Sequence, residues 1–340
     1  MKRYNKMQTD SKNMNDNCID FVIAWVDGTD EKWQKRKADA TGVSKDSSKH
    51  YRDWGFLPYL FKSIELYAPW VHHIYLVTDG QIPKCVDELP DSILKKLTIV
   101  DHRDFIPDKY LPTFNSHTIE LNFHRIEGLS EQFVYFNDDV LLTAPCKPTT
   151  FFKNGKAVDE AVLNGINGED SVFAGIQFHN MALMNKHYDI SAVRKNISKW
   201  LNFQYGMQNI RTLLLLPFRR LQAIHNPHGP MPLLKSTFEI LWDRDFEMLD
   251  RTCQCKLRDE GNVSIYVVRY EQLLSANFEP KKNENAFLQV TDGETKLARA
   301  LEKSQSVCIN DVELEEKEYV IIRSRIQALL DKKYKTNKGQ

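Results

Sequence analysis

Two adjacent aspartates at the end of an apolar run are the residues of this chain best suited to chemistry. Asp138 and Asp139 follow the apolar segment 133–136, which predicts a buried strand ending in carboxylates. Mg²⁺ and Mn²⁺ prefer carboxylate oxygens and bridge the phosphates of bound nucleotides. Adjacent side chains of an extended chain point to opposite faces, so we expect one carboxylate to bind metal directly, unless the chain bends at Asn137. A capped turn is the alternative that these residues leave open.

Three polar residues recur on one face of the helix predicted before this strand. His117, Glu120 and His124 are spaced i, i+3 and i+7, with Arg125 beside them. This spacing differs from the His-Glu-x-x-His zinc pattern, so we expect the face to line a polar cleft. Glu120 could fix a substrate hydroxyl, and Arg125 could hold phosphate through its planar fork. A surface or core role is the alternative for each residue.

Two later residues are candidates for proton transfer and charge stabilisation. His228 lies in segment 225–232, where three prolines within six residues restrict the backbone and hold the loop rigid. Its ordinary pKa near neutrality suits a general base. Arg258 is a candidate for stabilising charge on a phosphoryl group. A structural role is the alternative for both.

Alternating strands and helices must position these side chains. Apolar segments 19–26, 73–77, 97–100 and 133–136 predict strands, and the loops after them carry Asp27, Asp79, Asp101 and Asp138. The periodicity of residues 57–67 predicts an amphipathic helix, and another is expected from Asn115 or Ser116 to a stop at Gly128. In open α/β sheets, ligands bind at the carboxyl ends of the strands, so a shared acidic site is expected there. A helix-capping aspartate at each end is the alternative.

Composition and charge exclude several classes of protein. Lys+Arg and Asp+Glu are equal at 46 each, so no global field favours nucleic acid or an anionic membrane. No apolar run approaches the roughly 20 residues of a membrane helix, and the basic N-terminus lacks the apolar region of a signal peptide. The run 213–218, flanked by arginines, could touch a membrane surface, but we favour a buried segment. The glycines form neither a Walker loop nor a dinucleotide fingerprint.

The cysteines and the tail complete these expectations. Six irregularly spaced cysteines do not suggest a disulfide framework, which favours a reduced, cytoplasmic compartment. Residues 1–17 are polar and are expected to form a disordered tail.

These stretches together resemble the Stealth family, the sugar-1-phosphate transferases of bacterial capsule synthesis. The family also contains the catalytic subunit of the N-acetylglucosamine-1-phosphotransferase that marks lysosomal enzymes. The resemblance covers roughly residues 19–335 and is carried by segments 19–30, 63–83 and 115–140, and more loosely by the surroundings of His228, by 258–264 and by 308–312. Segment 52–55 reads Arg-Asp-Trp-Gly where the family usually has Arg-Asp-Asn-Glu, although Asp53 is retained.

What the resemblance implies is transfer at phosphorus. An acceptor sugar hydroxyl would attack the phosphorus nearest the sugar of a UDP-sugar, UMP would leave, and a phosphodiester would form. The assigned roles are Asp138 and Asp139 around Mg²⁺ or Mn²⁺, His228 as base, Arg258 and Arg125 on phosphate, Glu120 on sugar, and Asp27, Gly28, Asp53, Asp79, His117 and His124 along the bound substrates. Asp139, Glu120, His228 and Arg258 form the catalytic set.

The expected fold is α/β: a mostly parallel, Rossmann-like sheet of the GT-A type with helices on both faces and a helical elaboration toward the C-terminus. We expect one catalytic domain over residues 18–335, with a nucleotide- and metal-binding part (18–150) and a mainly helical, acceptor-side part (151–335). The expected partners are a UDP-sugar and a lipid-linked oligosaccharide or polysaccharide, with peripheral contact at the inner face of the membrane and no nucleic acid. A metal-dependent glycosyltransferase that releases UDP and a carbohydrate-binding protein without turnover are the alternatives.

Overall fold

A five-stranded sheet forms the centre of the molecule. The computed structural model describes residues 18–43, 52–166, 168 and 171–335, so the tail predicted at 1–17 lies outside the described residues. The sheet order is β10-β4-β1-β2-β3, formed by β1 (Ile19–Ala24), β2 (Ile74–Thr78), β3 (Leu97–Asp101), β4 (Gln132–Asn137) and β10 (Met231–Leu234). The first four strands pair in parallel, whereas β10 runs antiparallel to β4. The four strands predicted from apolar runs are therefore confirmed.

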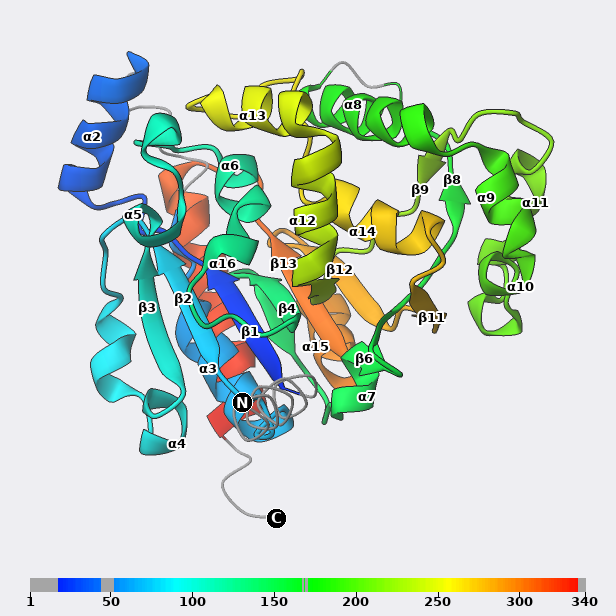
Figure 1. Ribbon diagram of the computed structural model, residues 1–340. Coiled ribbons are helices and arrows are strands. Elements are labelled where there is room, and N and C mark those ends of the chain that lie inside the picture. The colour runs from blue at the N-terminus through cyan, green and yellow to red at the C-terminus, as the bar shows by residue number, and fades with distance from the viewer. Residues whose placement is uncertain (1–17, 44–51, 167, 169–170, 336–340) are drawn as a thin grey trace, which may run out of the picture.

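Helices cover both faces of this sheet (Figure 1). They are α2 (Glu31–Thr41), α3 (Leu57–Tyr67), α4 (Asp91–Leu94), α5 (His102–Phe105), α6 (Ser116–Leu121), α7 (Pro148–Phe151), α8 (Val172–His187), α9 (Ile190–Lys195), α10 (Ile197–Trp200), α11 (Gln208–Leu215), α12 (Lys235–Arg244), α13 (Phe246–Gln254), α14 (Tyr266–Leu274), α15 (Glu294–Lys303) and α16 (Glu316–Lys335), with short 3-10 turns η2 (Lys84–Glu88), η3 (Asp108–Tyr110), η4 (Phe123–Arg125) and η5 (Phe203–Tyr205). One apolar core lies between the sheet and α3 and α16, and a second lies between the sheet and α12 and α14. Buried layers on both faces explain why β1 and β2 are apolar almost throughout.

Three small sheets extend the central one. A three-stranded sheet joins β12 (Asn285–Gln289), β13 (Ser306–Asn310) and β5 (Val140–Leu142), and β5 follows β4 after a two-residue turn. A second sheet contains β6 (Phe152–Lys153), β7 (Lys156–Asp159) and β11 (Phe278–Pro280), and β8 (Leu163–Asn164) pairs with β9 (Ala223–Ile224). The part beyond residue 150 is thus a mixture of helices and strands, and it supplies β10 to the central sheet.

The apolar run at 213–218 differs from our expectation. Helix α11 ends at Leu215, and Leu213, Leu214 and Phe218 are exposed. The prediction that this run is buried is therefore wrong. No helix within the described residues is long and apolar enough to cross a membrane.

Candidate active site

The turn between β4 and β5 holds Asp138 and Asp139. The main-chain carbonyl of Asp139 accepts a hydrogen bond from the Ile309 amide at 3.0 Å, and its Oδ2 lies 3.3 Å from the Cys308 thiol, which donates to it. The other carboxylate oxygen of Asp139, Oδ1, is buried and has no hydrogen-bond partner among the described residues. One oxygen is thus held by β13 while the other is available to a ligand.

Burial and acidic neighbours oppose ionisation of the two carboxyl groups in this turn. Burial raises the pKa of Asp138 to about 8, and the charges of Asp139 and Asp53 add to the shift. Burial also raises the pKa of Asp139 to about 6; the Cys308 thiol opposes this shift, whereas the charge of Asp311 adds to it. Crowded carboxylates resist ionisation unless a positive charge joins them. The turn therefore fits a cation.

The protein ligands here are few. No three His, Cys, Asp or Glu side chains in the described part of the chain are grouped so that they could hold a metal ion alone. Mg²⁺ is commonly bound through one or two carboxylates together with waters and substrate phosphates. Asp138 and Asp139 fit such a site, which the phosphates of a substrate would complete.

Two tyrosines lie among the predicted site residues, and Tyr135 connects the end of β4 to α6. The Tyr135 hydroxyl lies 3.1 Å from Oε1 of Glu120 and contacts Oδ1 of Asn137. Burial raises the pKa of Tyr266, whose hydroxyl donates to the Pro227 carbonyl at 3.4 Å, in the segment that carries His228. Neither tyrosine was singled out by our sequence analysis, since each lies within an apolar run that gave no polar signal. Glu120 therefore lies close to the end of β4, and its predicted contact with a sugar stays a prediction.

His117 faces the same carboxylate from one helical turn away. Asn115 caps α6 by accepting from the His117 amide at 3.1 Å, one of the two caps that we considered. His117 Nδ1 lies 3.6 Å from Oε2 of Glu120, and both ring nitrogens are buried without a hydrogen-bond partner in the described part. A buried imidazole with both nitrogens unpaired is unusual and suits contact with a bound ligand.

His228 approaches the aspartates across the small β12-β13-β5 sheet. Its ring centroid lies 4.4 Å from that of Phe287 on β12. Phe287 pairs in register with Cys308 on β13, whose thiol contacts Asp139. Phe287 and Cys308 thus connect the predicted base to the predicted metal ligand, through the pairing of β12 with β13. The connection between His228 and Asp139 is therefore indirect, and their joint role in one site stays a prediction.

The charge state of His228 suits proton acceptance. Although part of the residue is open to solvent, desolvation of the ring lowers its pKa, and the nearby His225 lowers it further. A histidine with a pKa below its usual 6.5 is neutral at pH 7. A neutral imidazole can accept a proton from a hydroxyl.

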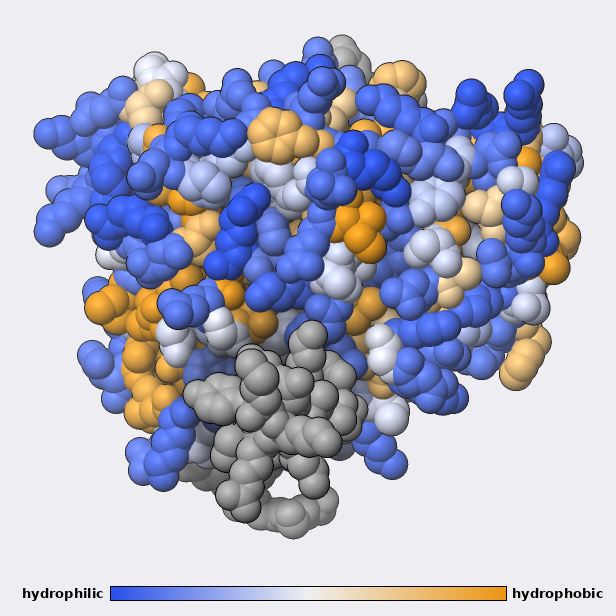
Figure 2. Space-filling view, in the orientation of Figure 1, coloured by the Kyte–Doolittle hydropathy of each residue, from blue (hydrophilic) through white to orange (hydrophobic). Residues whose placement is uncertain are grey.

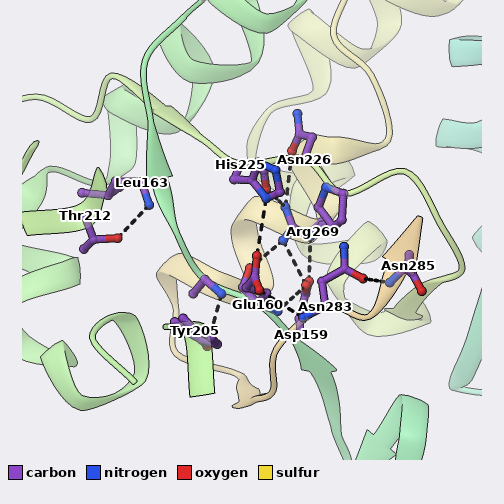
Figure 3. Close-up of polar contacts among 12 residues, drawn as sticks. Asp159, Glu160, Leu163, Tyr205, Thr212, His225, Asn226, Arg269, Asn283 and Asn285 are labelled. Atoms are coloured by element: carbon purple, nitrogen blue, oxygen red, sulfur yellow. Dashed lines mark hydrogen bonds and ion pairs between the residues drawn. The ribbon is translucent and has the colours of Figure 1, made fainter. Parts of the chain in front are cut away.

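A buried arginine holds the loop that carries His228 (Figure 3). Arg269, on α14, makes two hydrogen bonds to the carboxylate of Asp159, at 2.7 and 2.9 Å. It also donates to the carbonyls of His225 and Glu160, at 2.8 Å each. The planar fork thus fixes the start of the loop relative to β7.

Gly229 closes the other side of the loop. A Cβ atom at this position would lie 2.1 Å from Nδ2 of Asn285, so only glycine permits this approach to β12. Asn285 is itself held by the Ser306 hydroxyl, which donates to its Oδ1 at 2.6 Å. The stiffness predicted from the prolines is therefore reinforced by packing.

Arg258 lies at the start of α6. Its Nε donates to Oγ of Ser116 at 3.1 Å, and its guanidinium stands 5.9 Å from the centre of the Phe173 ring. The side chain is exposed, beside the helix that carries His117 and Glu120.

The ends of β1 and β2 lie on the same edge of the sheet, but their carboxylates are engaged locally. Oδ1 of Asp27 accepts from the amide and hydroxyl of Thr29, at 2.8 and 2.6 Å. The Gln81 side chain bonds both the amide and the carbonyl of Asp27, at 3.0 Å each, which ties the two loops together. Asp79 forms an ion pair with Arg36 of α2 at 2.8 Å. In the structure, Asp27 therefore stabilises a turn, and Asp79 is the partner of an ion pair.

Gly28 and Asp53 complete the predicted set. The Gly28 carbonyl accepts from Gln34 at 2.8 Å, and Oδ1 of Asp53 accepts from the Gly55 amide at 2.7 Å. The charge of Asp53 reaches Asp138, so it belongs to the acidic cluster.

Trp54, where our sequence departs from the family pattern, points into the core. Its ring packs on Phe56 and edge-on against Tyr319 of α16, 4.9 Å between centroids. The departure is therefore a packing change.

His124 and Arg125 are not brought to the strand end. Helix α6 stops at Leu121, and His124 is buried with its ring stacked 5.5 Å from that of Phe238 on α12. Arg125 is exposed, with its guanidinium 5.0 Å from the centre of the Trp242 ring. The expectation that both join His117 and Glu120 on one continuous face fails, because the helix ends before it reaches them.

Comparison with known proteins shows the family to which the chain is related. Two family models match: Stealth protein CR1, conserved region 1, over residues 19–42, and Stealth protein CR2, conserved region 2, over residues 50–159. Exopolysaccharide phosphotransferase cps2G of Lactiplantibacillus plantarum is 39% identical over 77% of each chain. Capsular polysaccharide phosphotransferase WcwK of Streptococcus pneumoniae is 34% identical over 87% of this chain and 90% of its own.

A more distant likeness is found among solved structures. The galactosyltransferase LgtC, in complex with donor and acceptor sugar analogs, has a TM-score of 0.40 and 11% identity, covering 92% of this chain and 95% of its own. The mixed α/β fold, the acidic strand end and the phosphotransferase relatives together define a transferase. The chain belongs to the Stealth family.

Proposed function

We propose that this enzyme transfers a hexose-1-phosphate or N-acetylhexosamine-1-phosphate from a UDP-sugar to a sugar hydroxyl of a capsular or cell-surface polysaccharide. The relatives are named as capsular, exopolysaccharide and receptor polysaccharide phosphotransferases, which supports the reaction class. The observation that supports the proposal is the path His228–Phe287–Cys308–Asp139, which connects the loop of the predicted base to an acidic turn suited to a cation.

Each site residue has a separate role in one nucleophilic displacement at phosphorus. His228 takes the proton of the acceptor hydroxyl as its oxygen forms a bond to the phosphorus nearest the donor sugar, and the bond to the UMP oxygen breaks. Asp138 and Asp139 would hold Mg²⁺ or Mn²⁺, which neutralises phosphate charge when bound. Arg258 supports the same charge from the rim of α6. Glu120, positioned by Tyr135, holds a sugar hydroxyl, and His117 contacts the donor.

The identity of the nucleotide product tests the proposal. Purified protein is incubated with a panel of UDP-sugars, Mn²⁺ or Mg²⁺ and an oligosaccharide acceptor, and nucleotides are separated by ion-exchange chromatography. We expect UMP in an amount equal to the phosphodiester seen by ³¹P NMR, and no activity after chelation of divalent cations. UDP as the sole nucleotide product would establish a glycosyltransferase instead, and no nucleotide consumption with any donor would favour a binding protein.

A pair of matched variants connects this activity to the site. Asp139→Asn keeps the size of the side chain but removes its charge, so turnover should fall by roughly 10²-fold or more. Asp243→Asn makes the same change on the exposed face of α12 and should leave turnover unaltered. Equal activity in the two variants would exclude Asp139 from catalysis.

A further inference from the structure

The α9–α11 region, residues 190–220, presents an apolar face to solvent. Phe203 is 88% exposed, Met207 83% and Leu214 69%, with Ile210 and Phe218 about half exposed. Met207, Ile210 and Leu214 recur at helical spacing i, i+3 and i+7, so they share one side of α11. The opposite side is held to the protein by Thr212, whose buried hydroxyl accepts from the Leu163 amide at 3.1 Å. Helix α11 therefore turns its apolar side outward, the reverse of an ordinary surface helix.

The charge of this region is equally one-sided. The sequence contains no aspartate or glutamate from Ile190 to Phe238, although the whole chain has equal numbers of acidic and basic residues. The basic residues of the region are Arg194, Lys195, Lys199, Arg211, Arg219 and Arg220. Arg211, on α11, and Arg219, beyond its end, are both exposed, and Asp189 precedes Ile190, whose amide donates to the Arg219 carbonyl at 3.3 Å.

The region also projects from the body of the molecule. In Figure 1, α9, α10 and α11 lie at the right-hand end, beyond the small sheet that contains β11. Figure 2 shows orange apolar side chains at this edge, between blue hydrophilic ones. A projecting apolar face with basic residues around it can enter a lipid headgroup layer without collision with the rest of the fold.

We propose that this face docks the enzyme on an anionic lipid surface, with Phe203, Met207 and Leu214 in the headgroup–acyl boundary and the exposed Arg211 and Arg219 on lipid phosphates. A second copy of the chain is a poorer partner, because two copies would bring their basic residues together. Lipid binding is separate from the proposed transfer reaction, so each can fail without the other.

Vesicle binding of the purified full chain tests the proposal without substrate. We expect co-sedimentation with phosphatidylcholine vesicles that contain phosphatidylglycerol, weak binding to phosphatidylcholine alone, and weaker binding at high salt. Each of Arg211→Gln and Arg219→Gln should lower the partition coefficient by about fivefold. Phe203→Gln with Leu214→Gln should lower it by roughly tenfold or more.

Matched substitutions elsewhere serve as controls. Ile82→Gln after β2 and Ile321→Gln on α16 replace similarly exposed apolar side chains and should leave binding unchanged. Equal loss in the control variants, or equal binding to neutral and anionic vesicles, would overturn the proposal. So would a dimer in analytical ultracentrifugation that Leu214→Gln converts to a monomer, because the face would then be a contact between copies. The arginine variants keep the test valid if the apolar ones unfold.

Discussion

The buried imidazole of His124 should make the enzyme less stable in mild acid. Its ring lies against Phe238 and 6.1 Å from that of Trp242, and burial lowers its pKa to about 3, with Arg125 and Lys235 adding to the shift. The unfolded chain takes up a proton near the ordinary value of 6.5, whereas the folded protein does not. Acid therefore favours unfolding: the contribution is complete above pH 6.5 and is lost progressively as the pH falls toward 3.

The size of the effect follows from these two values. Between pH 7 and pH 5, proton uptake by the unfolded state lowers the free energy of unfolding by about 2 kcal/mol, and by about 1.4 kcal/mol for each further pH unit down to the folded pKa. In His124→Phe the ring stays stacked on Phe238 but cannot titrate. The variant should therefore lose about 2 kcal/mol less than the parent protein between these pH values.

Urea denaturation followed by circular dichroism at pH 7 and pH 5 measures the difference. A comparison at pH 8 gives the effect of the substitution alone, because the imidazole is neutral there in both states. The same pH dependence in variant and parent would show that His124 is not a buried, neutral ring. A raised KM for the sugar nucleotide in His124→Phe would instead support the expectation from the sequence that His124 contacts the substrate.

Three further substitutions examine the loop that carries the base. His228→Ala should reduce turnover by roughly 10²–10⁴-fold with little change in donor KM, and the acid limb of the parent's pH–rate profile should have its midpoint below pH 6.5, since the neutral ring is the active form. Gly229→Ala should displace the loop from Asn285 and lower kcat. Gly293→Ala, where a Cβ meets open space, should leave kcat unchanged. Equal kcat values in the two variants would show that the close approach of Gly229 to Asn285 does not affect turnover. Arg269→Met should cost about 3–5 kcal/mol of stability in urea denaturation, because it leaves the carboxylate of its ion pair buried and unpaired, and a loss below 1 kcal/mol would contradict that account.

The strands and the acidic turn could be predicted because their signals are local. Each of the four parallel strands is a short apolar run ended by polar residues, and parallel pairing brings their ends to one edge without further information. The adjacent Asp138 and Asp139 stood out for the same reason. The placement of Cys308 against Asp139 depends on the pairing of β13 with β5, which joins distant parts of the chain and leaves no local pattern.

The error at His124 has a local cause that periodicity alone does not reveal. The Asn122 side chain donates to the Thr118 carbonyl at 2.8 Å, which occupies the acceptor that a continuing helix would use. The chain then turns through η4, ending at Arg125, and Gly128 with φ +79° completes the reversal. The spacing i, i+3 and i+7 of His117, Glu120 and His124 therefore continues past the end of α6. The last of these residues, His124, faces a different part of the protein.

The pairing of β10 with β4 limits where the chain can be truncated or joined to a related protein. It follows the His228 loop directly and is hydrogen-bonded along β4, the strand that leads to Asp138. A fragment ending near residue 150 would leave β4 as a bare, apolar outer strand inviting aggregation. Chimeras that exchange acceptor preference between relatives must therefore keep β10 matched to its host β4, and split-expression schemes should fail to give a folded N-terminal half.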